Sequence, residues 1–244
     1  PKSKKWFKSW LTGSDFLYGR KNYCLWLTDA SPAELQEMPH VMKRIVAVQK
    51  FRLASKSSQK FAATPWLFRE TEIPKTFLLI PKTSSETRRF LPIGFVSDAV
   101  VSNSSLYLGN ATLYEFGILS STMHNAWVRY TCGRLESRYR YSAGIVYNNY
   151  PWPTELTDAQ RSAVATAAQA VLDARAAHQT GATPASLATL YNPTTMPPNL
   201  VAAHKALDKA VDAAYGKKGL ATDADRVAFL FTQYEKITSL LAGE

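Results

Sequence analysis

Residues 133–153 read GRLESRYRYSAGIVYNNYPWP, and this stretch decides the expected fold around it. Glu136, Arg138 and Arg140 are spaced two apart, while serine and tyrosine fill the alternate positions. Because side chains two apart on a strand face the same way, the alternation predicts a β-strand over residues 136–141. Residues 144–147 are predicted to form another strand segment, which the following asparagines and prolines end.

The row of one carboxylate and two guanidinium groups has two interpretations. On a strand it would span about 13 Å, two steps of roughly 6.5 Å, which matches several stacked base pairs. Arginine donates in a fork to guanine N7 and O6, and glutamate accepts from cytosine N4, so the row could read base edges in DNA. The alternative is a ladder of cross-strand salt bridges on a solvated face. The pattern by itself favours neither interpretation.

Charge and aromatic residues are distributed unevenly along the 244 residues, whose composition is globular at 46% hydrophobic and 20% charged. Residues 1–153 contain 21 Lys+Arg, 10 Asp+Glu and 24 of the 29 aromatic residues. Residues 154–244 contain 8 Lys+Arg and 9 Asp+Glu. The sequence therefore predicts two domains, 1–153 and 154–244, and predicts that the first binds a polyanion.

The first domain is predicted to mix strands and helices. Short β-rich or apolar runs predict strands at residues 22–28, 77–81, 89–97 and 100–108. Helical spacing predicts helices over residues 31–48, 111–119 and 121–132. The expected fold class of this part is α+β.

The second domain is predicted to be all-α. Thr157 and Gln160 match a capping box, which opens an alanine-rich helix that reaches about His178. A second helix is expected over residues 199–215, and Thr222 is expected to cap a third that reaches about Leu241. Helices of this kind can pack as a small bundle.

Signals for catalysis or metal binding are weak. The sequence has no glycine-rich dinucleotide fingerprint, no phosphate-binding loop and no nucleophile elbow. Cys132 and His124 lie eight residues apart on one expected helix, roughly 12 Å, so His124 is expected on the helix surface and Cys132 at the packed helix end. Two cysteines and four scattered histidines give no ligand spacing. We expect no catalytic residue and no metal site.

Features of the chain as a whole indicate a cytoplasmic protein. No run of about 18 apolar residues is present, so no membrane contact is expected. The first residues are polar and basic without an apolar core behind them, unlike a signal peptide. Residue 1 is proline rather than methionine, which suggests a piece of a longer protein.

Three stretches resemble one family. Residues 123–153, MHNAWVRYTCGRLESRYRYSAGIVYNNYPWP, resemble the target recognition domain of MmeI-type enzymes, and so do GSDFLYGRKNYCLWL and RRFLPIGFV. These enzymes are type IIL restriction–modification proteins, single chains that fuse a nuclease, an adenine-N6 methyltransferase and DNA recognition. The resemblance covers residues 1–153, and the helical remainder resembles the C-terminal helical region of the same family.

The resemblance implies roles for individual residues. The strand aligned with Glu136, Arg138 and Arg140 supplies base-reading side chains, which vary between members with the recognised sequence. Ser104 aligns with a position that cooperates with the Arg140 position. Residues 147–153 resemble a hinge into the helical region, in which asparagines satisfy backbone groups and Trp152 packs.

The resemblance also implies what this chain leaves to other domains. The Asn/Asp-Pro-Pro-Tyr motif of the methyltransferase and its cofactor loop do not occur here. The chain is therefore expected to recognise double-stranded DNA without a cofactor of its own, beside methyltransferase and nuclease domains of the same parent chain. The full-length protein is implied to use Mg²⁺ and S-adenosylmethionine, and to methylate one adenine flipped out of the duplex.

Other assignments rest on charge alone or remain open. Candidates for phosphate contacts are Lys4, Lys5, Arg88 and Arg89. A module that binds structured RNA is compatible with the charge and the aromatic residues, but it leaves the Glu–Arg row unexplained. A hydrolase with Cys132 as nucleophile and a protein–protein adaptor are further alternatives, and the adaptor fits the helical part better.

Overall fold

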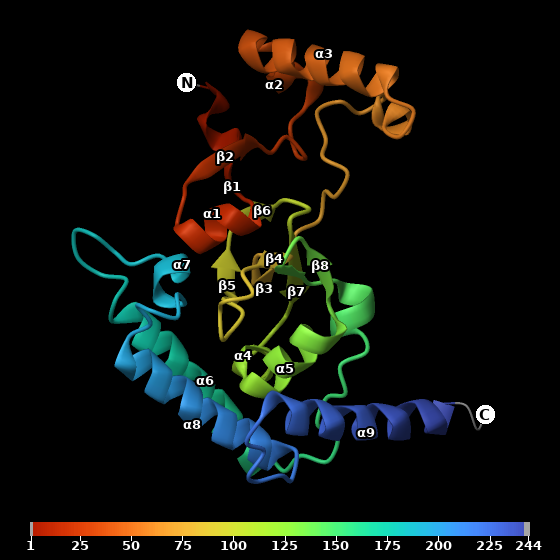
Figure 1. The fold of residues 1–244 in the computed structure, drawn as a ribbon. Helices are drawn as coiled ribbons and strands as arrows, with labels where there is room; N and C mark the ends of the chain where they lie inside the picture. The colour runs from red at the N-terminus through yellow and green to blue at the C-terminus, as the bar shows by residue number, and fades with distance from the viewer. Residues whose placement is uncertain (1, 242–244) are drawn as a thin grey trace. The chain divides into compact units, whose positions relative to one another are not determined.

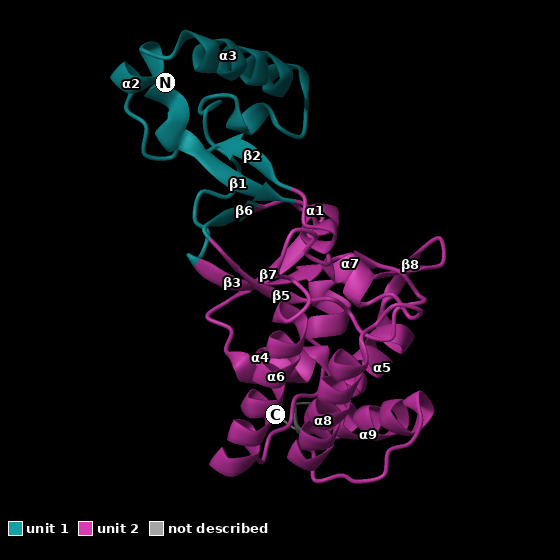
Figure 2. Ribbon diagram, turned by 90° about the vertical axis from the view of Figure 1, so that its left-hand side faces the viewer, with its two compact units in different colours: residues 1–11, 21–75, 98–100 teal, residues 12–20, 76–97, 101–244 magenta. Residues whose placement is uncertain are grey.

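The computed structural model describes residues 2–241, with small sheets and helices followed by a helical C-terminal region (Figure 1). The predicted fold class, α+β followed by all-α, is confirmed. The chain forms two compact units (Figure 2): unit 1 comprises residues 1–11, 21–75 and 98–100, and unit 2 comprises residues 12–20, 76–97 and 101–244. The C-terminal helices therefore share a unit with much of the preceding part. The boundary at residue 153 follows a change in composition and stays a prediction.

Unit 1 combines a small sheet with helices around its own core. The sheet has the order β2-β1-β6, with strands Asn22–Leu25, Phe7–Leu11 and Ala99–Val101. The helical elements are η1 (Lys2–Trp6), α2 (Pro32–Gln36), α3 (Pro39–Ala54) and η2 (Gln59–Phe61). The buried core residues are Leu27, Leu35, Met38, Val41 and Ile45. Only the first half of α3 contributes to this core.

The helix predicted over residues 31–48 is in fact two helices. Ser31 and Glu34 form a capping box at the start of α2, but this helix ends at Gln36. Met38 has ψ 75°, outside the helical region, because Pro39 disfavours helical backbone at the residue before it. Pro39 then occupies the first turn of α3, where its missing N–H costs nothing.

The central sheet of unit 2 is antiparallel and has the order β5-β3-β7, with strands Gly94–Ser97, Thr76–Pro81 and Ser105–Gly109. β3 contains the strand predicted at 77–81, and all its residues except the first are buried. The strand predicted over residues 89–97 is wrong in its first half, since only β5 is extended. Pro92 cannot donate to a strand ladder, and the Leu91 N–H donates instead to the Asn125 side chain at 2.7 Å.

Residues 133–140 form a β-hairpin rather than one strand. β8 (Gly133–Leu135) pairs antiparallel with β9 (Arg138–Arg140), and β4 (Thr83–Ser84) pairs with the other edge of β9. Glu136 opens the two-residue loop with φ +58°, the positive φ that the common two-residue hairpin turns require at their first central residue. The strand predicted over residues 136–141 is confirmed for Arg138–Arg140 and wrong at its start, because the chain reverses at Glu136.

The segment after the hairpin also differs from its prediction. Residues Ala143–Tyr147 form a π-helical turn, η3, instead of a strand, and the Ser142 side chain accepts the N–H of Ile145. Asn149 Nδ2 donates to the carbonyls of Gly144 and Ile145 at 2.9 and 3.1 Å. A side-chain amide thus satisfies backbone groups here, as the resemblance implied.

The remaining helices of unit 2 are α1 (Gly13–Tyr18), α4 (Leu113–Ser120), α5 (Thr122–Thr131), α6 (Asp158–Ala176), α7 (Leu187–Leu190), α8 (Pro198–Ala214) and α9 (Asp223–Leu241). The predicted caps at Thr157 and Thr222 are confirmed. α6 packs on both α4 and α8, and α9 packs on α5 (Figure 1). The C-terminal helices thus share one core with the helices that precede the hairpin.

Candidate nucleic-acid interface

Arg138 and Arg140 lie on the exposed face of β9. Tyr139, between them, is only 8% exposed, and the Arg134 guanidinium carbon lies 4.2 Å from its ring centroid. Glu136 lies outside the strand, in the hairpin loop, where its Oε2 accepts from Arg138 Nη2 at 2.8 Å. The structure therefore presents two arginines on one strand face and a carboxylate at the adjoining turn.

The end of β9 is anchored by a buried pair. The backbone N–H of Tyr141 donates to the Lys82 carbonyl at 2.8 Å, and its hydroxyl lies 3.1 Å from His124 Nε2. His124 Nδ1 is 3.0 Å from the Leu119 carbonyl, which can only accept, so Nδ1 carries the proton and Nε2 accepts from the tyrosine. His124 is 1% exposed, and burial lowers its pKa to about 3. The predicted surface position of His124 is wrong, and the neutral ring instead supports the hairpin.

A cleft of about 550 Å³ in unit 2 brings the hairpin together with three other segments of the chain. This recognition cleft is lined by Thr12, Gly13, Ser14, Leu17, Tyr18, Thr83, Ser84, Ser85, Arg88, Ser102, Asn103, Ser104, Leu135 and Arg138. Two guanidinium groups and no carboxylate belong to this described lining. The structure therefore brings together Ser104, Arg88 and Arg138 from the predicted site. Glu136 and Arg140 lie outside the lining.

Ser104 is held in the cleft by the start of α1. Its Oγ accepts the backbone N–H of Gly13 at 2.9 Å and lies 2.6 Å from Ser102 Oγ. A Cβ at Gly13 would lie 3.1 Å from the Ser104 carbonyl oxygen, so glycine permits this close approach. The contribution of residues 12–14 was missed from the sequence. The capping-box pattern Thr12–Asp15, which the structure confirms, was the available signal that a helix begins there.

The predicted phosphate contacts Lys4 and Lys5 lie in unit 1 and differ in their surroundings. Lys4 is exposed. Lys5 Nζ donates to Glu34 Oε1 at 2.5 Å, and this contact, with the Ser31 cap, lowers the pKa of Glu34 to about 2. Of the two ammonium groups, Lys4 is therefore the one without a carboxylate partner among the described residues.

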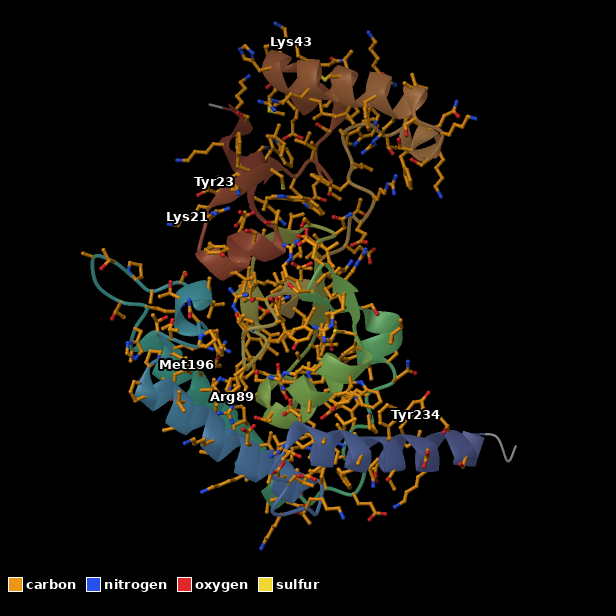
Figure 3. All side chains as sticks on the ribbon, viewed as in Figure 1. Lys21, Tyr23, Lys43, Arg89, Met196 and Tyr234 are labelled. Carbon is orange, nitrogen blue, oxygen red and sulfur yellow. The ribbon has the colours of Figure 1, made fainter. Side chains whose placement is uncertain are left out.

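Arg88 and Arg89 are neighbours in sequence but line different cavities. Arg88 lines the recognition cleft beside Arg138. Arg89 (Figure 3) is exposed, and its guanidinium carbon lies 5.2 Å from the ring centroid of Phe90. It lines a polar cavity of about 270 Å³ with Asp208 and Asp223. Arg129 and Arg226 line this cavity as well, so Arg89 lies in a mixed cluster of charges that includes none of the base-reading candidates.

Neither a catalytic pair nor a metal-binding group is evident in the described part of the chain. Leu119 and Tyr141 engage both ring nitrogens of His124, so His124 does not activate Cys132. Burial raises the pKa of the Cys132 thiol, which disfavours the thiolate. Residues 2–241 contain no group of three or more His, Cys, Asp or Glu side chains that could hold a metal ion. No helix in this range is long and apolar enough to cross a membrane.

Comparison with known proteins identifies the family. Residues 1–154 match the family described as MmeI, target recognition domain, and residues 156–242 match MmeI, C-terminal domain. This chain belongs to the MmeI family. The predicted resemblance is therefore confirmed over both parts of the chain.

The chain matches only part of the length of two similar proteins. DNA methyltransferase A of Bacillus subtilis (strain 168) is 37% identical over 242 residues, which cover 98% of this chain and 27% of the relative. A solved structure of the type IIL restriction–modification enzyme MmeI in complex with DNA is 47% identical, with a TM-score of 0.93, and the match covers 98% of this chain and 32% of that one. The chain spans about a third or less of these relatives.

The two MmeI matches meet just after the segment that the resemblance marked as a hinge. Trp152 of this segment contacts the rings of Tyr114, Tyr147 and Tyr150, with centroid distances of 5.6–6.4 Å. Tyr150 is buried, and its hydroxyl accepts from the Tyr215 hydroxyl at 2.8 Å. The aromatic residues of this segment therefore pack the junction, which fits a structural role for Trp152.

Proposed function

We propose that this chain is the DNA-recognition module of a type IIL restriction–modification protein and that it reads base edges in the major groove. The observation that carries the proposal is the recognition cleft, whose described lining contains Arg138, Arg88 and Ser104. The one carboxylate paired with Arg138 among the described residues is Glu136, at the hairpin loop outside this lining. The match to the MmeI target recognition domain and the similarity to an MmeI structure that contains DNA support it. The net charge of +10 favours a polyanionic partner.

The geometry suggests how each base-reading candidate acts. Arg138 and Arg140 face the same side of β9, roughly 6.5 Å apart, so each can donate in a fork to a guanine of a different base pair. Glu136 sits at the hairpin loop beside Arg138, where it can accept from cytosine N4 or orient the guanidinium. The Gly13 N–H holds the Ser104 hydroxyl, which lines the same cleft as Arg138 and can contact a base edge there.

Phosphate contacts complete the proposed footprint. Lys4, Lys5, Arg88 and Arg89 are the candidates, and Arg88 is the one that lies in the recognition cleft. Such contacts set orientation and salt dependence but carry no sequence information. We expect Lys4→Ala to weaken binding to all duplex sequences alike.

We place the chemistry of the parent protein in domains beyond this chain. A methyltransferase that uses S-adenosylmethionine and a nuclease that uses Mg²⁺ would be its partners within one cytoplasmic polypeptide. The described residues offer no cluster of metal ligands that would suit Mg²⁺. The role proposed for this chain is to position the flipped adenine for those domains.

The proposal is tested by binding to a randomised pool of duplex DNA over a series of salt concentrations, with duplex RNA of the same sequences alongside. One enriched DNA sequence, with affinity that falls steeply with salt, is the expected result. Equal affinity for RNA and DNA without enrichment would instead favour the RNA-binding alternative. No binding at low salt would favour the adaptor.

Arg138→Ala tests the reading role directly. We expect it to lower discrimination at one base pair of the enriched sequence by about 1–3 kcal/mol, with little effect on random DNA. Arg161→Ala is the matched control, because Arg161 is also exposed but lies on α6 over Tyr114. Equal losses on the enriched and random sequences for Arg138→Ala would contradict base reading.

A further inference from the structure

Arg175 is a buried cation without a carboxylate partner. It lies near the end of α6 and is 3% exposed. Its Nε donates to the Tyr191 hydroxyl and its Nη1 to the Ile93 carbonyl, both at 2.7 Å. Its Nη2 is buried with no hydrogen-bond partner among residues 2–241, and none of the ion pairs in that range involves Arg175. One of its three nitrogens, Nη2, is therefore a buried donor without a partner in this range.

The surroundings of Arg175 stabilise its charge only in part. The rings of Phe116 and Tyr191 have centroids 5.1 and 4.8 Å from the guanidinium carbon, which provides cation–π attraction. The Tyr191 hydroxyl bridges to His204 Nε2 at 2.8 Å. Burial holds the pKa of His204 well below its ordinary value, and the nearby charge of Arg175 lowers this pKa further. The His204 ring is therefore neutral. A buried charge without a counter-charge is costly, and an anion would relieve that cost.

Arg175 forms part of the wall of a cleft of about 490 Å³ within unit 2. Apolar walls are contributed by Phe16, Phe95, Leu172 and Leu187, and polar groups by Gln179 and Ser186. The described lining contains no Asp or Glu, so the positive charge of Arg175 is not offset within the cleft wall. This volume, with mostly apolar walls and a few polar groups, is typical of a site for a small organic molecule.

The glycine on β5 keeps this cleft open beside the cation. A Cβ at Gly94 would lie 3.1 Å from Phe16 Cζ and 3.7 Å from Arg175 Nη1. A side chain at this position would therefore occupy the space between the aromatic ring and the guanidinium. The strand thus leaves room where an anion would have to enter.

We propose that the Arg175 cleft binds a small organic acid, a carboxylate carried on a planar apolar body. The carboxylate accepts a charge-assisted hydrogen bond from Arg175 Nη2, the guanidinium nitrogen that has no other partner among residues 2–241. The apolar body lies against Phe16 and Phe95. The proposal does not rest on the proposed DNA recognition, since Arg138 and Ser104 line the recognition cleft and not this one, although Tyr18 lines both.

Calorimetric titration of the whole chain with benzoate and with its neutral analogue benzamide tests the proposal. We expect benzoate to bind about 10- to 100-fold more tightly than benzamide, because a charge-assisted hydrogen bond is lost with the amide. Arg175→Gln should remove this preference. Arg161→Gln is the control on the same helix: its guanidinium also stacks on a tyrosine but is exposed, and the preference should persist.

A second variant keeps the test decisive if Arg175→Gln fails to fold. Ala185→Trp adds a large ring to the cleft wall while Arg175 is kept, and benzoate binding should be lost while circular dichroism remains native. Three outcomes would overturn the proposal: equal affinity for benzoate and benzamide, no detectable benzoate binding, or undiminished binding to a folded Ala185→Trp variant. Displacement of benzoate by duplex DNA would also overturn it and would assign the cleft to a DNA phosphate.

Discussion

Glu136 has a left-handed backbone conformation that favours glycine, with φ +58° at the tip of the hairpin. A side chain with a Cβ costs roughly 1–2 kcal/mol in this conformation. Glu136→Gly and Glu136→Ala both remove the contact with Arg138, but only the glycine relieves the strain. We expect the glycine variant to be the more stable by about 1 kcal/mol in urea unfolding. An alanine variant that is equally or more stable would show that the turn is not strained.

His124 predicts a pH dependence of stability. Its folded pKa of about 3 lies below the ordinary value of 6.5, so the unfolded chain binds a proton that the folded chain does not. The corresponding stability is complete above pH 6.5 and is lost as the pH falls from 6.5 towards 3. The slope is about 1.4 kcal/mol per pH unit within this window.

Urea unfolding at pH 7.5, 6 and 5 checks this slope against a His124→Gln variant. The variant should lose less stability than the native chain over the lower interval. His204 is also held neutral by burial, but it is common to both proteins and cancels in the difference. Identical slopes for the two proteins would contradict a neutral His124.

Single residues show what the sequence could and could not reveal. The alternation of arginine and tyrosine correctly predicted which of residues 138–141 are exposed, because it reflects burial on one strand. The reversal at Glu136 was missed, since no glycine or asparagine marks the turn. The contact of Ser104 with Gly13 spans 91 positions along the chain, and no local pattern encodes it.

At the scale of elements, the close packing of α4 against α6 and α8 depends on Gly117. A Cβ there would lie 2.8 Å from Val164 Cγ1 and 3.1 Å from the Ala168 Cβ. We expect Gly117→Val to destabilise the fold by about 1–3 kcal/mol through overpacking, measured by urea unfolding. Gly144→Val is the control, because an added Cβ at Gly144 meets nothing within 4 Å. Equal effects of the two substitutions would exclude helix contact as the cause.

Element boundaries were predictable where a side chain supplies the cap. The capping box of Thr157 and Gln160 lies within four residues of sequence, so it could be recognised before the structure. The break at Met38 was also local, because Pro39 restricts the residue before it, although helical spacing continues through both segments. The π-helical turn over Ala143–Tyr147 could not be predicted from spacing, since its apolar residues are equally compatible with a strand.

At the scale of the whole molecule, the positive charge is concentrated in unit 1, which has 13 Lys+Arg against 6 Asp+Glu, a net of +7. The larger unit 2 has 16 against 13, a net of +3. α3 carries Lys43 (Figure 3), Arg44, Lys50 and Arg52, and it contains no acidic residue. This helix therefore adds a basic surface to the candidates for phosphate contact.

Replacing Lys43 and Lys50 together by glutamine should weaken binding to every DNA sequence. If both ammonium groups neutralise phosphates, the slope of log K against log salt falls in magnitude by about 1.8. Glutamine at Lys205 and Lys209 of α8, two exposed lysines of unit 2, is the control and should leave the slope unchanged. A change of slope in the control alone would place the DNA elsewhere on the molecule.

The division into units was the least predictable feature of the fold. The amino-acid composition changes at residue 153, from basic and aromatic-rich to neutral and alanine-rich. This change in composition does not indicate which segments pack together in the fold. Unit 1 is assembled from three separated segments, and its sheet is completed by Ala99–Val101. Pairing between strands so distant in sequence depends on tertiary packing, and no local sequence pattern predicts it.

The sheet of unit 1 also has a consequence for folding on the ribosome. β2 can pair with β1 soon after residue 25 has emerged, but β6 is synthesised more than seventy residues later. At roughly 5–20 residues per second, the ribosome needs on the order of ten seconds to synthesise this stretch. During this time one edge of β1 has no partner strand. An open strand edge is a template for wrong pairing, and the basic side chain of Lys8 on β1 would discourage neighbouring nascent chains from joining it.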